Sequence, residues 1–258
     1  MIRLGRISYV NMAPIFFGLD ANVDEVPGVP TELNRRLLAG EIDLAPISSI
    51  AYARDADALR ILPRVAVCSE GAVDSIQLIS RAPLPRVRTI AVTPESATSV
   101  VLMRILLPDA EHVPLGEDAD ATLLIGDAAL KSMFEDPTPH YDLGRLWCER
   151  TGLPMIFAVF ACPHPPPDGV VAVEDALLTA HRENRAEPER LARAASELYG
   201  YPAGFLARYF EKLRYGFGPR ERAGLLTFFE LARDAGELET IPELRFVSQS
   251  TSGAEVIV

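Results

Sequence analysis

Short apolar runs alternate with helical segments through the first two thirds of the chain. Thr89–Val92 and Ala121–Ile125 have the length and composition of strands, and Pro154–Ala161 is a continuous apolar run typical of a buried strand. Between such runs, the segment from Pro30 to Gly40 carries leucines at helical spacing. This alternation predicts βαβ units, and therefore an α/β protein with parallel strands. Further strands are expected at Ile2–Ser8, Asp24–Val26, Glu41–Ile47, Leu59–Cys68 and Ser75–Ser80, with helices at Met12–Leu19 and Tyr141–Thr151.

From Val170 onward the pattern changes to helices alone. Four segments begin mostly near a proline and end mostly near glycine or asparagine, which is the usual asymmetry of helix ends. Their Leu, Phe and Ala stripes are typical of helix faces that pack on a core. We therefore expect a helical C-terminal part, with helices at Val173–Arg185, Pro188–Tyr199, Pro202–Arg214 and Pro219–Ala235.

Two proline-rich segments, Ala82–Pro85 and Pro163–Pro167, interrupt the α/β pattern and are candidate linkers. They predict a bilobed protein. Lobe 1 would comprise residues 1–86, completed by the helical residues 163–258, and lobe 2 would comprise residues 87–162. In such proteins a ligand lies in the cleft between the lobes, near the carboxyl ends of the strands.

The stretch from Thr89 to Met103 shows where such a ligand could bind. After the strand, Thr93 and Pro94 turn the chain, and Ser96 or Thr98 is placed to cap an apolar helix. Free backbone N–H groups and the helix dipole favour an anion there, most simply a carboxylate. The alternative is an ordinary helix cap with no ligand.

Other polar residues fall at predicted strand ends and turns in both lobes, which favours the carboxylate site over the simple cap. An acidic chain can still bind an anion through such dipoles, because they act at short range. The candidate binding residues are Asn11, Ser48, Ser49 and Ser75 in lobe 1, and Thr93, Ser96, Thr98, Ser99, Gly126 and Asp127 in lobe 2.

Composition excludes several classes of partner. A net charge of −11 argues against nucleic acid and anionic membranes. The three scattered cysteines and four dispersed histidines form no metal-ligand pattern, so neither a metal nor a cofactor is expected. No apolar run reaches membrane-span length, and the first residues enter a strand without a signal-peptide pattern, so a cytoplasmic location is expected.

No nucleophile motif or phosphate-binding glycine loop is present. Asp127 and Glu95 could serve as acid–base groups. The alternative for Asp127, which is the simpler one, is a helix N-cap, and the alternative for Glu95 is that it does no more than stabilise the helix dipole. Composition and spacing therefore leave open whether the protein binds a carboxylate or also transforms it.

Six segments carry a family resemblance: Arg6–Asn11, Gly40–Tyr52, Gly71–Ser75, Thr93–Val100, Leu124–Leu130 and Tyr141–Pro154. In this order, from the N-terminus to about Ala161, they resemble motifs of the chorismate dehydratases of the futalosine route to menaquinone. The resemblance implies a two-lobed fold like that of type II periplasmic binding proteins. It also implies a lyase that removes water from chorismate to give 3-[(1-carboxyvinyl)oxy]benzoate.

The resemblance further implies that Asn11 and Ser75 are active-site groups that hold the substrate. It supports the loop of Ser96, Thr98 and Ser99 as a carboxylate cradle. Two alternatives stay open at this point. One is a cytoplasmic protein that binds a small carboxylate without chemistry, and the other is the sister cyclase 1,4-dihydroxy-6-naphthoate synthase, whose opening Ser-Pro-Cys-Pro-Asn-Asp pattern is absent here.

Overall fold

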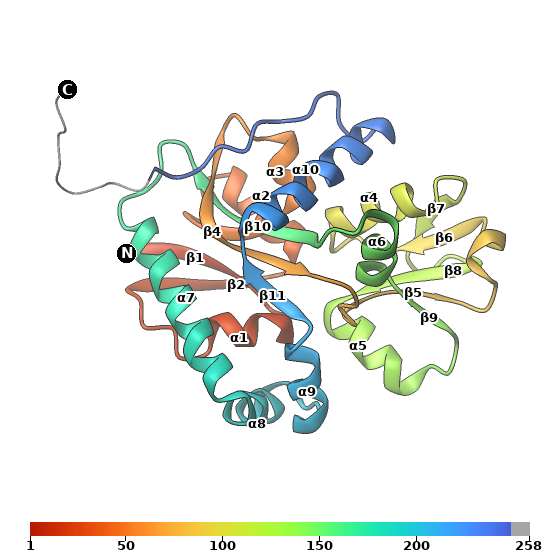
Figure 1. Cartoon of the computed structure of the whole chain (residues 1–258), viewed down its shortest axis with the longest axis horizontal. Helices are drawn as coiled ribbons and strands as arrows, with labels where there is room; N and C mark the ends of the chain where they lie inside the picture. Colours follow the sequence, from red (N-terminus) through yellow and green to blue (C-terminus); the bar gives the residue numbers. More distant parts are fainter. Residues whose placement is uncertain (249–258) are drawn as a thin grey trace.

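The structure, a computed structural model, describes residues 1–248 of the chain. Its strands form three sheets within these residues, and Figure 1 shows helices and sheets gathered into two lobes that lie side by side. The predicted α/β class with two lobes is therefore confirmed. One continuous cluster of buried apolar side chains runs through both lobes, so the lobes share a packed interior.

Lobe 1 contains a parallel pair, β1 and β2, and a four-stranded sheet of order β11-β4-β10-β3. The four-stranded sheet is antiparallel, with β10 in its interior between β3 and β4. Ile47 and Val159 are buried in two of these strands, as the apolar runs predicted. The strands of this lobe are β1 (Ile2–Ile7), β2 (Val23–Gly28), β3 (Ala45–Ser48), β4 (Leu59–Ser69), β10 (Met155–Pro163) and β11 (Leu213–Gly216).

Lobe 2 is built on a five-stranded sheet of order β7-β6-β8-β5-β9. Strand β6 pairs in parallel with both β7 and β8, whereas β5 pairs antiparallel with β8 and β9. The sheet is therefore mixed, with the predicted parallel βαβ unit at one side. Its strands are β5 (Ile76–Ser80), β6 (Thr89–Val92), β7 (Glu111–Pro114), β8 (Ala121–Ile125) and β9 (His140–Asp142).

The helices follow the predicted pattern with one correction. The segment Pro202–Arg214 is not a single helix, because the helix ends at Phe210 and the chain then forms the edge strand β11. Leu213 and Tyr215 point into the core while Arg214 is exposed, which is the alternation of a strand. The helices are α1 (Ala13–Phe16), α2 (Pro30–Leu38), α3 (Ser49–Arg54), α4 (Ala97–Leu106), α5 (Gly126–Glu135), α6 (Leu143–Thr151), α7 (Val170–Ala186), α8 (Pro188–Tyr199), α9 (Ala203–Phe210) and α10 (Pro219–Asp234), with short 3₁₀ turns η1 (Val10–Met12) and η2 (Leu84–Arg86).

The chain passes between the two large sheets at places other than the proline-rich segments. Strand β5 already belongs to the sheet of lobe 2, and β10 returns to the sheet of lobe 1. The crossings therefore lie between β4 and β5, and between α6 and β10. The ranges 1–86, 87–162 and 163–258 stay a prediction as limits of folding domains. The sheets themselves divide differently, because β5 lies before residue 87 but belongs to the sheet of lobe 2, and β10 begins before residue 163 but belongs to the sheet of lobe 1.

Within residues 1–248, no helix is both long and apolar enough to cross a lipid bilayer.

Candidate active site

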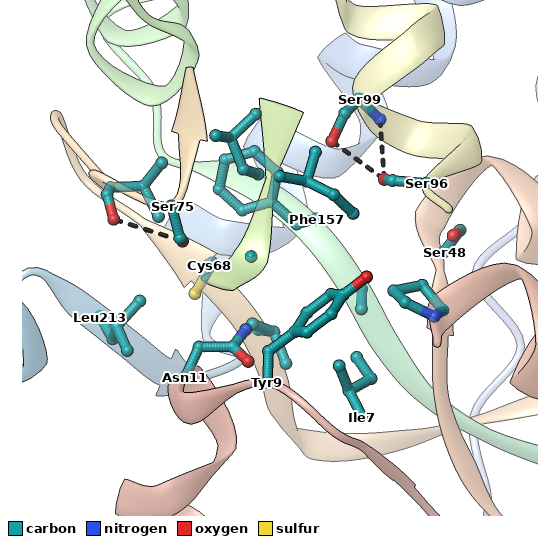
Figure 2. A pocket seen from close by; sticks show the side chains of 17 residues that line it. Ile7, Tyr9, Asn11, Ser48, Cys68, Ser75, Ser96, Ser99, Phe157 and Leu213 are labelled. Atoms are coloured by element: carbon teal, nitrogen blue, oxygen red, sulfur yellow. Dashed lines mark hydrogen bonds between the residues drawn. The ribbon is translucent and has the colours of Figure 1, made fainter. Parts of the chain in front are cut away.

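A narrow pocket lies between the two lobes, and side chains of both lobes form its walls (Figure 2). Its empty space amounts to about 560 Å³ when the opening to solvent is included, but only about 50 Å³ admits the centre of a water-sized sphere. The lobes are therefore close together in this structure. The polar lining residues are Tyr9, Asn11, Ser48, Ser75, Ser96 and Ser99.

The amino end of α4 provides the hydroxyl groups at one side of the pocket. Ser96 is the N-cap: its Oγ accepts a hydrogen bond from the Ser99 N–H at 3.2 Å and donates to the Ser99 Oγ at 2.9 Å. The first amides of a helix have no partner within the helix, so those of Ala97 and Thr98 are available to an acceptor. This end of α4 can therefore bind a carboxylate, as the sequence predicted.

Asn11 lies in the 3₁₀ turn η1, at the end of β1, and faces the pocket from lobe 1. Its backbone carbonyl accepts a hydrogen bond from the Tyr215 hydroxyl, which fixes the turn against β11. Its side-chain Oδ1 is buried and has no hydrogen-bond partner within the described residues. A buried acceptor without a partner is costly, so a ligand that donates a hydrogen bond there would stabilise the site.

Ser75 also lines the pocket, from the tight turn before β5. Its Oγ donates a long hydrogen bond of 3.4 Å to the Val73 carbonyl, which a hydrogen bond to a ligand could replace. The preceding residue, Asp74, has a φ of 59°, a left-handed conformation that is uncommon outside glycine. Lys212 of lobe 1 bonds the Asp74 carboxylate at 2.5 Å and holds this conformation from outside.

The half-buried carboxylate of Asp142 supports the same turn from behind. It accepts hydrogen bonds from the backbone N–H groups of Val73 and Asp74 and from the Gln77 side chain, and it also caps α6. Burial raises the pKa of Asp142, while its backbone donors act in the opposite direction. Asp142 therefore determines where Ser75 stands, although it does not line the pocket.

We expect Asp142→Asn to destabilise the fold and to lower activity together. The new NH₂ group would face backbone donors, so the free energy of unfolding should fall by about 2–4 kcal/mol, measured by urea titration. The matched control is Asp120→Asn, which also loses an acceptor for two backbone N–H groups but at the surface. Equal losses in the two variants would contradict the positioning role of Asp142.

Hydrogen bonds join the lobes around the pocket, and four of them involve residues beside its lining. The Tyr9 hydroxyl donates to Glu95 Oε2 at 2.7 Å, and the Val10 N–H donates to Asp127 Oδ1 at 3.0 Å. The backbone N–H of Thr31 donates to the Glu95 carbonyl at 3.2 Å, and a longer bond of 3.4 Å joins the Ile50 N–H to Thr98 Oγ1. The structure therefore represents the closed arrangement of the two lobes.

Four of the predicted binding residues lie near the pocket but do not line it. The Ser49 hydroxyl donates to the Ile156 carbonyl at 2.7 Å, and the Thr93 hydroxyl accepts from the Glu95 N–H at 3.2 Å. Thr98 is used in the contact between lobes, so Ser96 and not Thr98 caps α4. The prediction that Asp127 is a helix N-cap is wrong, because Ile125 occupies that position and Asp127 instead accepts from Val10 of η1.

Sequence reasoning missed Tyr9, Phe157 and Cys68 as lining residues. Phe157 and Cys68 come from the apolar strands β10 and β4, where nothing in the local sequence marks them. Tyr9 lies within Arg6–Asn11, a segment of the family resemblance, so that motif was the signal that could have found it. Tyr9 and Cys68 are also the titratable groups in the lining. Burial raises the pKa of both, and the bond to Glu95 raises that of Tyr9 further, so both stay protonated near neutral pH.

The chain has the two-lobed fold of periplasmic binding proteins, with a pocket between its lobes. Two solved structures share this fold. A protein of Archaeoglobus fulgidus aligns with a TM-score of 0.78 and 20% identity, covering 92% of this chain and 98% of that one. A Candida albicans protein described as having the generic periplasmic binding protein fold aligns with a TM-score of 0.71 and 13% identity, covering 95% and 92%.

The chain belongs to the menaquinone biosynthesis family, whose model matches residues 2–234. A chorismate dehydratase of Thermus thermophilus is 36% identical over 256 residues, which is 88% of this chain and 93% of that protein. A chorismate dehydratase of Campylobacter jejuni is 34% identical over 167 residues, 61% of this chain and 66% of that protein.

Proposed function

We propose that this protein is a chorismate dehydratase, a lyase that removes water from chorismate to give 3-[(1-carboxyvinyl)oxy]benzoate. The observation that carries the proposal is the pocket lined by Asn11 and Ser75 on one side and by the amino end of α4 on the other (Figure 2). The two curated relatives named for this activity support it. Chorismate is a small dicarboxylate, which suits a pocket of hydroxyls, an amide and free N–H groups.

Among residues 1–248, no side chain that lines the pocket is a ready proton acceptor. Its titratable lining groups, Tyr9 and Cys68, are held protonated by burial, and no carboxylate, histidine, lysine or arginine is among its lining residues. Glu95 is engaged by the Tyr9 hydroxyl, and Asp127 by the Val10 N–H. These observations support a mechanism in which the substrate supplies its own base.

In this mechanism one carboxylate of chorismate, held by the closed pocket, takes the ring proton. The electron pair of that C–H bond forms the new ring double bond as the neighbouring C–O bond breaks. The leaving hydroxide takes the proton from the substrate carboxyl and departs as water, which regenerates the carboxylate. Aromatisation provides the driving force, so the protein mainly lowers the barrier by orientation. Asn11 and Ser75 would hold the substrate by hydrogen bonds, and Ser48, Ser96, Ser99 and the N–H groups of α4 would hold a carboxylate.

The direct test is to mix the purified protein with chorismate and to follow the ultraviolet spectrum and the product mass. We expect an aromatic product lighter than chorismate by one water, formed at a rate proportional to the protein concentration. Binding of chorismate without product would favour the carboxylate-binding alternative. Turnover of a later pathway intermediate in place of chorismate would favour the sister cyclase.

The two carboxylates beside the pocket test the substrate-base mechanism. We expect Asp127→Asn and Glu95→Gln each to retain turnover within about tenfold of the wild type, since loss of a contact between lobes costs about 1 kcal/mol. Initial rates at saturating chorismate, with circular dichroism as the folding control, measure this. A folded variant with no activity would identify that carboxylate as the base and refute the mechanism.

The cytoplasmic location stays a prediction, as do the absence of a cofactor and of a metal requirement.

A further inference from the structure

A second cavity lies behind β11, on the side away from the candidate active site. It is enclosed by α1, α7, α8, α9 and β11, and Leu213 borders both cavities. Its cavity volume is about 330 Å³, compared with about 50 Å³ for the candidate active site. A small organic molecule therefore fits this cavity without movement of the lobes.

Three nitrogen-bearing side chains of α7 face this cavity together. His181, Asn184 and Arg185 stand three and four residues apart, so they share one face of the helix. Asn184 is buried, and its NH₂ group donates to the carbonyls of Pro14 and Phe17, which fixes α7 against α1. The face that α7 presents to the cavity is therefore held in place.

Arg214 of β11 adds a second guanidinium. One of its NH₂ groups donates to the carbonyls of Glu211 and Leu213, which anchors the side chain at the cavity wall. Neither Arg185 nor Arg214 has a carboxylate oxygen within 4 Å among residues 1–248, whereas Arg64 and Arg220 form ion pairs. Both side chains are exposed at the cavity mouth, and within the described residues no acidic side chain pairs with either guanidinium, so both can bind an anion there.

The charges around His181 agree with this geometry. Burial lowers the pKa of His181, and the positive charges of Arg185 and Arg214 lower it further, so both guanidiniums act on this ring. Glu211 is the one carboxylate in the lining, and it opposes the two arginines. With His181 neutral, the cavity keeps an excess of positive charge beside apolar walls that include Leu191 and Phe210.

We propose that this second cavity binds a small organic carboxylate with an apolar body. The guanidiniums of Arg185 and Arg214 would hold the carboxylate, since a planar guanidinium binds it through paired hydrogen bonds. Leu191 and Phe210 would contact the apolar body. The site is distinct from the candidate active site and does not depend on the dehydratase proposal.

An occupant there would be linked to Asn11 through two residues, His181 and Tyr215. The His181 ring packs edge-on against Tyr215 with ring centroids 4.9 Å apart, and the Tyr215 hydroxyl donates to the Asn11 carbonyl. No histidine lines the candidate active site, and the chain has four histidines, so the His181 imidazole is a resolvable reporter of the second cavity.

Benzoate is a suitable probe, with benzamide as its uncharged counterpart of the same shape. The full-length protein is titrated with each, and the imidazole resonances are followed by NMR, with His181→Gln identifying the signal. We expect benzoate to shift the His181 resonance in a saturable manner and benzamide to leave it unchanged. Absence of a benzoate shift, or an equal shift with benzamide, would overturn the proposal.

Charge variants separate the two cavities. We expect Arg185→Gln and Arg214→Gln each to raise the dissociation constant for benzoate about tenfold, and Glu211→Gln to lower it. Arg182→Gln is the matched control, because Arg182 lies on the same helix but outside the cavity lining. If benzoate acted from the active site through Tyr215, Arg185→Gln would leave the constant unchanged and the proposal would fail.

Discussion

Asn11→Ala is expected to lower the turnover of chorismate by about 10²–10³-fold, the effect of removing a group that stabilises charge or geometry at the reacting atoms. The side chain of Asn11 lines the pocket, and its Oδ1 has no partner within the described residues. Its removal therefore leaves no protein group unsatisfied, and the bond from Tyr215 to its backbone carbonyl remains. Activity should fall while the thermal midpoint of unfolding stays unchanged.

Initial-rate kinetics with chorismate, together with thermal unfolding, measure both parts of this expectation. The matched control is Asn22→Ala, at an exposed position outside the pocket, which should leave turnover unchanged. Retained turnover in folded Asn11→Ala would remove Asn11 from the mechanism. A large loss of stability would instead show that the Asn11 side chain stabilises the fold.

Gly126→Ala is expected to lower kcat/KM by about 100-fold, the effect of displacing a substrate-positioning wall by a fraction of an ångström or more. Gly126 has a φ of 56°, and a Cβ there would lie 2.5–2.7 Å from three ring atoms of Tyr9. Because these atoms include the inner ring carbon, Tyr9 must move as a whole. The Tyr9–Glu95 bond, which holds the lobes together, would break with it.

A second glycine separates this collision from backbone strain. Gly40 has a φ of 71° with nothing within 4 Å of an added Cβ, so Gly40→Ala bears the left-handed conformation alone. Both variants should lose about 1–2 kcal/mol of unfolding free energy from that conformation. Only Gly126→Ala should lose activity, measured by steady-state kinetics. Equal activity in the two variants would mean that Tyr9 has no part in shaping the pocket.

Much of the fold could be predicted from local pattern, because the apolar residues of its longer elements recur at the spacing of a helix or a strand. The apolar run at Pro154–Ala161 and the proline-initiated helices gave β10, α8 and α10 within a few residues. Three strands were missed. β9 has only three residues, β7 is half exposed, and β11 follows a helix with little to separate them in sequence.

Sheet membership was beyond the reach of local pattern. The apolar sequences of β5 and β10 predict strands but do not indicate the sheet to which each belongs. Their partner strands are distant in the chain and are selected by packing. The proline-rich segments therefore did not coincide with the crossings between the sheets. Proline indicates where regular structure stops, and it carries no information about which sheet comes next.

The sequence predicted those site residues whose role depends on the local turn or on a recognisable motif. Ser96 is a helix cap by local rules, and Asn11 and Ser75 were identified by resemblance, and all three line the pocket. Asp127 and Thr98 were placed in the site, but tertiary contacts use both to join the lobes. Tyr9 was missed because its importance comes from Glu95, which is 86 positions away.

Four of the hydrogen bonds that join the lobes lie beside the pocket and must break when it opens. Each contributes about 0.5–1.5 kcal/mol net, so these four together favour the closed arrangement by a few kcal/mol. A pocket this narrow exchanges its contents only when these bonds are broken. We therefore expect an open arrangement, as a minor state, to form once per turnover. Variants that weaken these bonds would shift that population, and release of the product, rather than the chemical step, would change first.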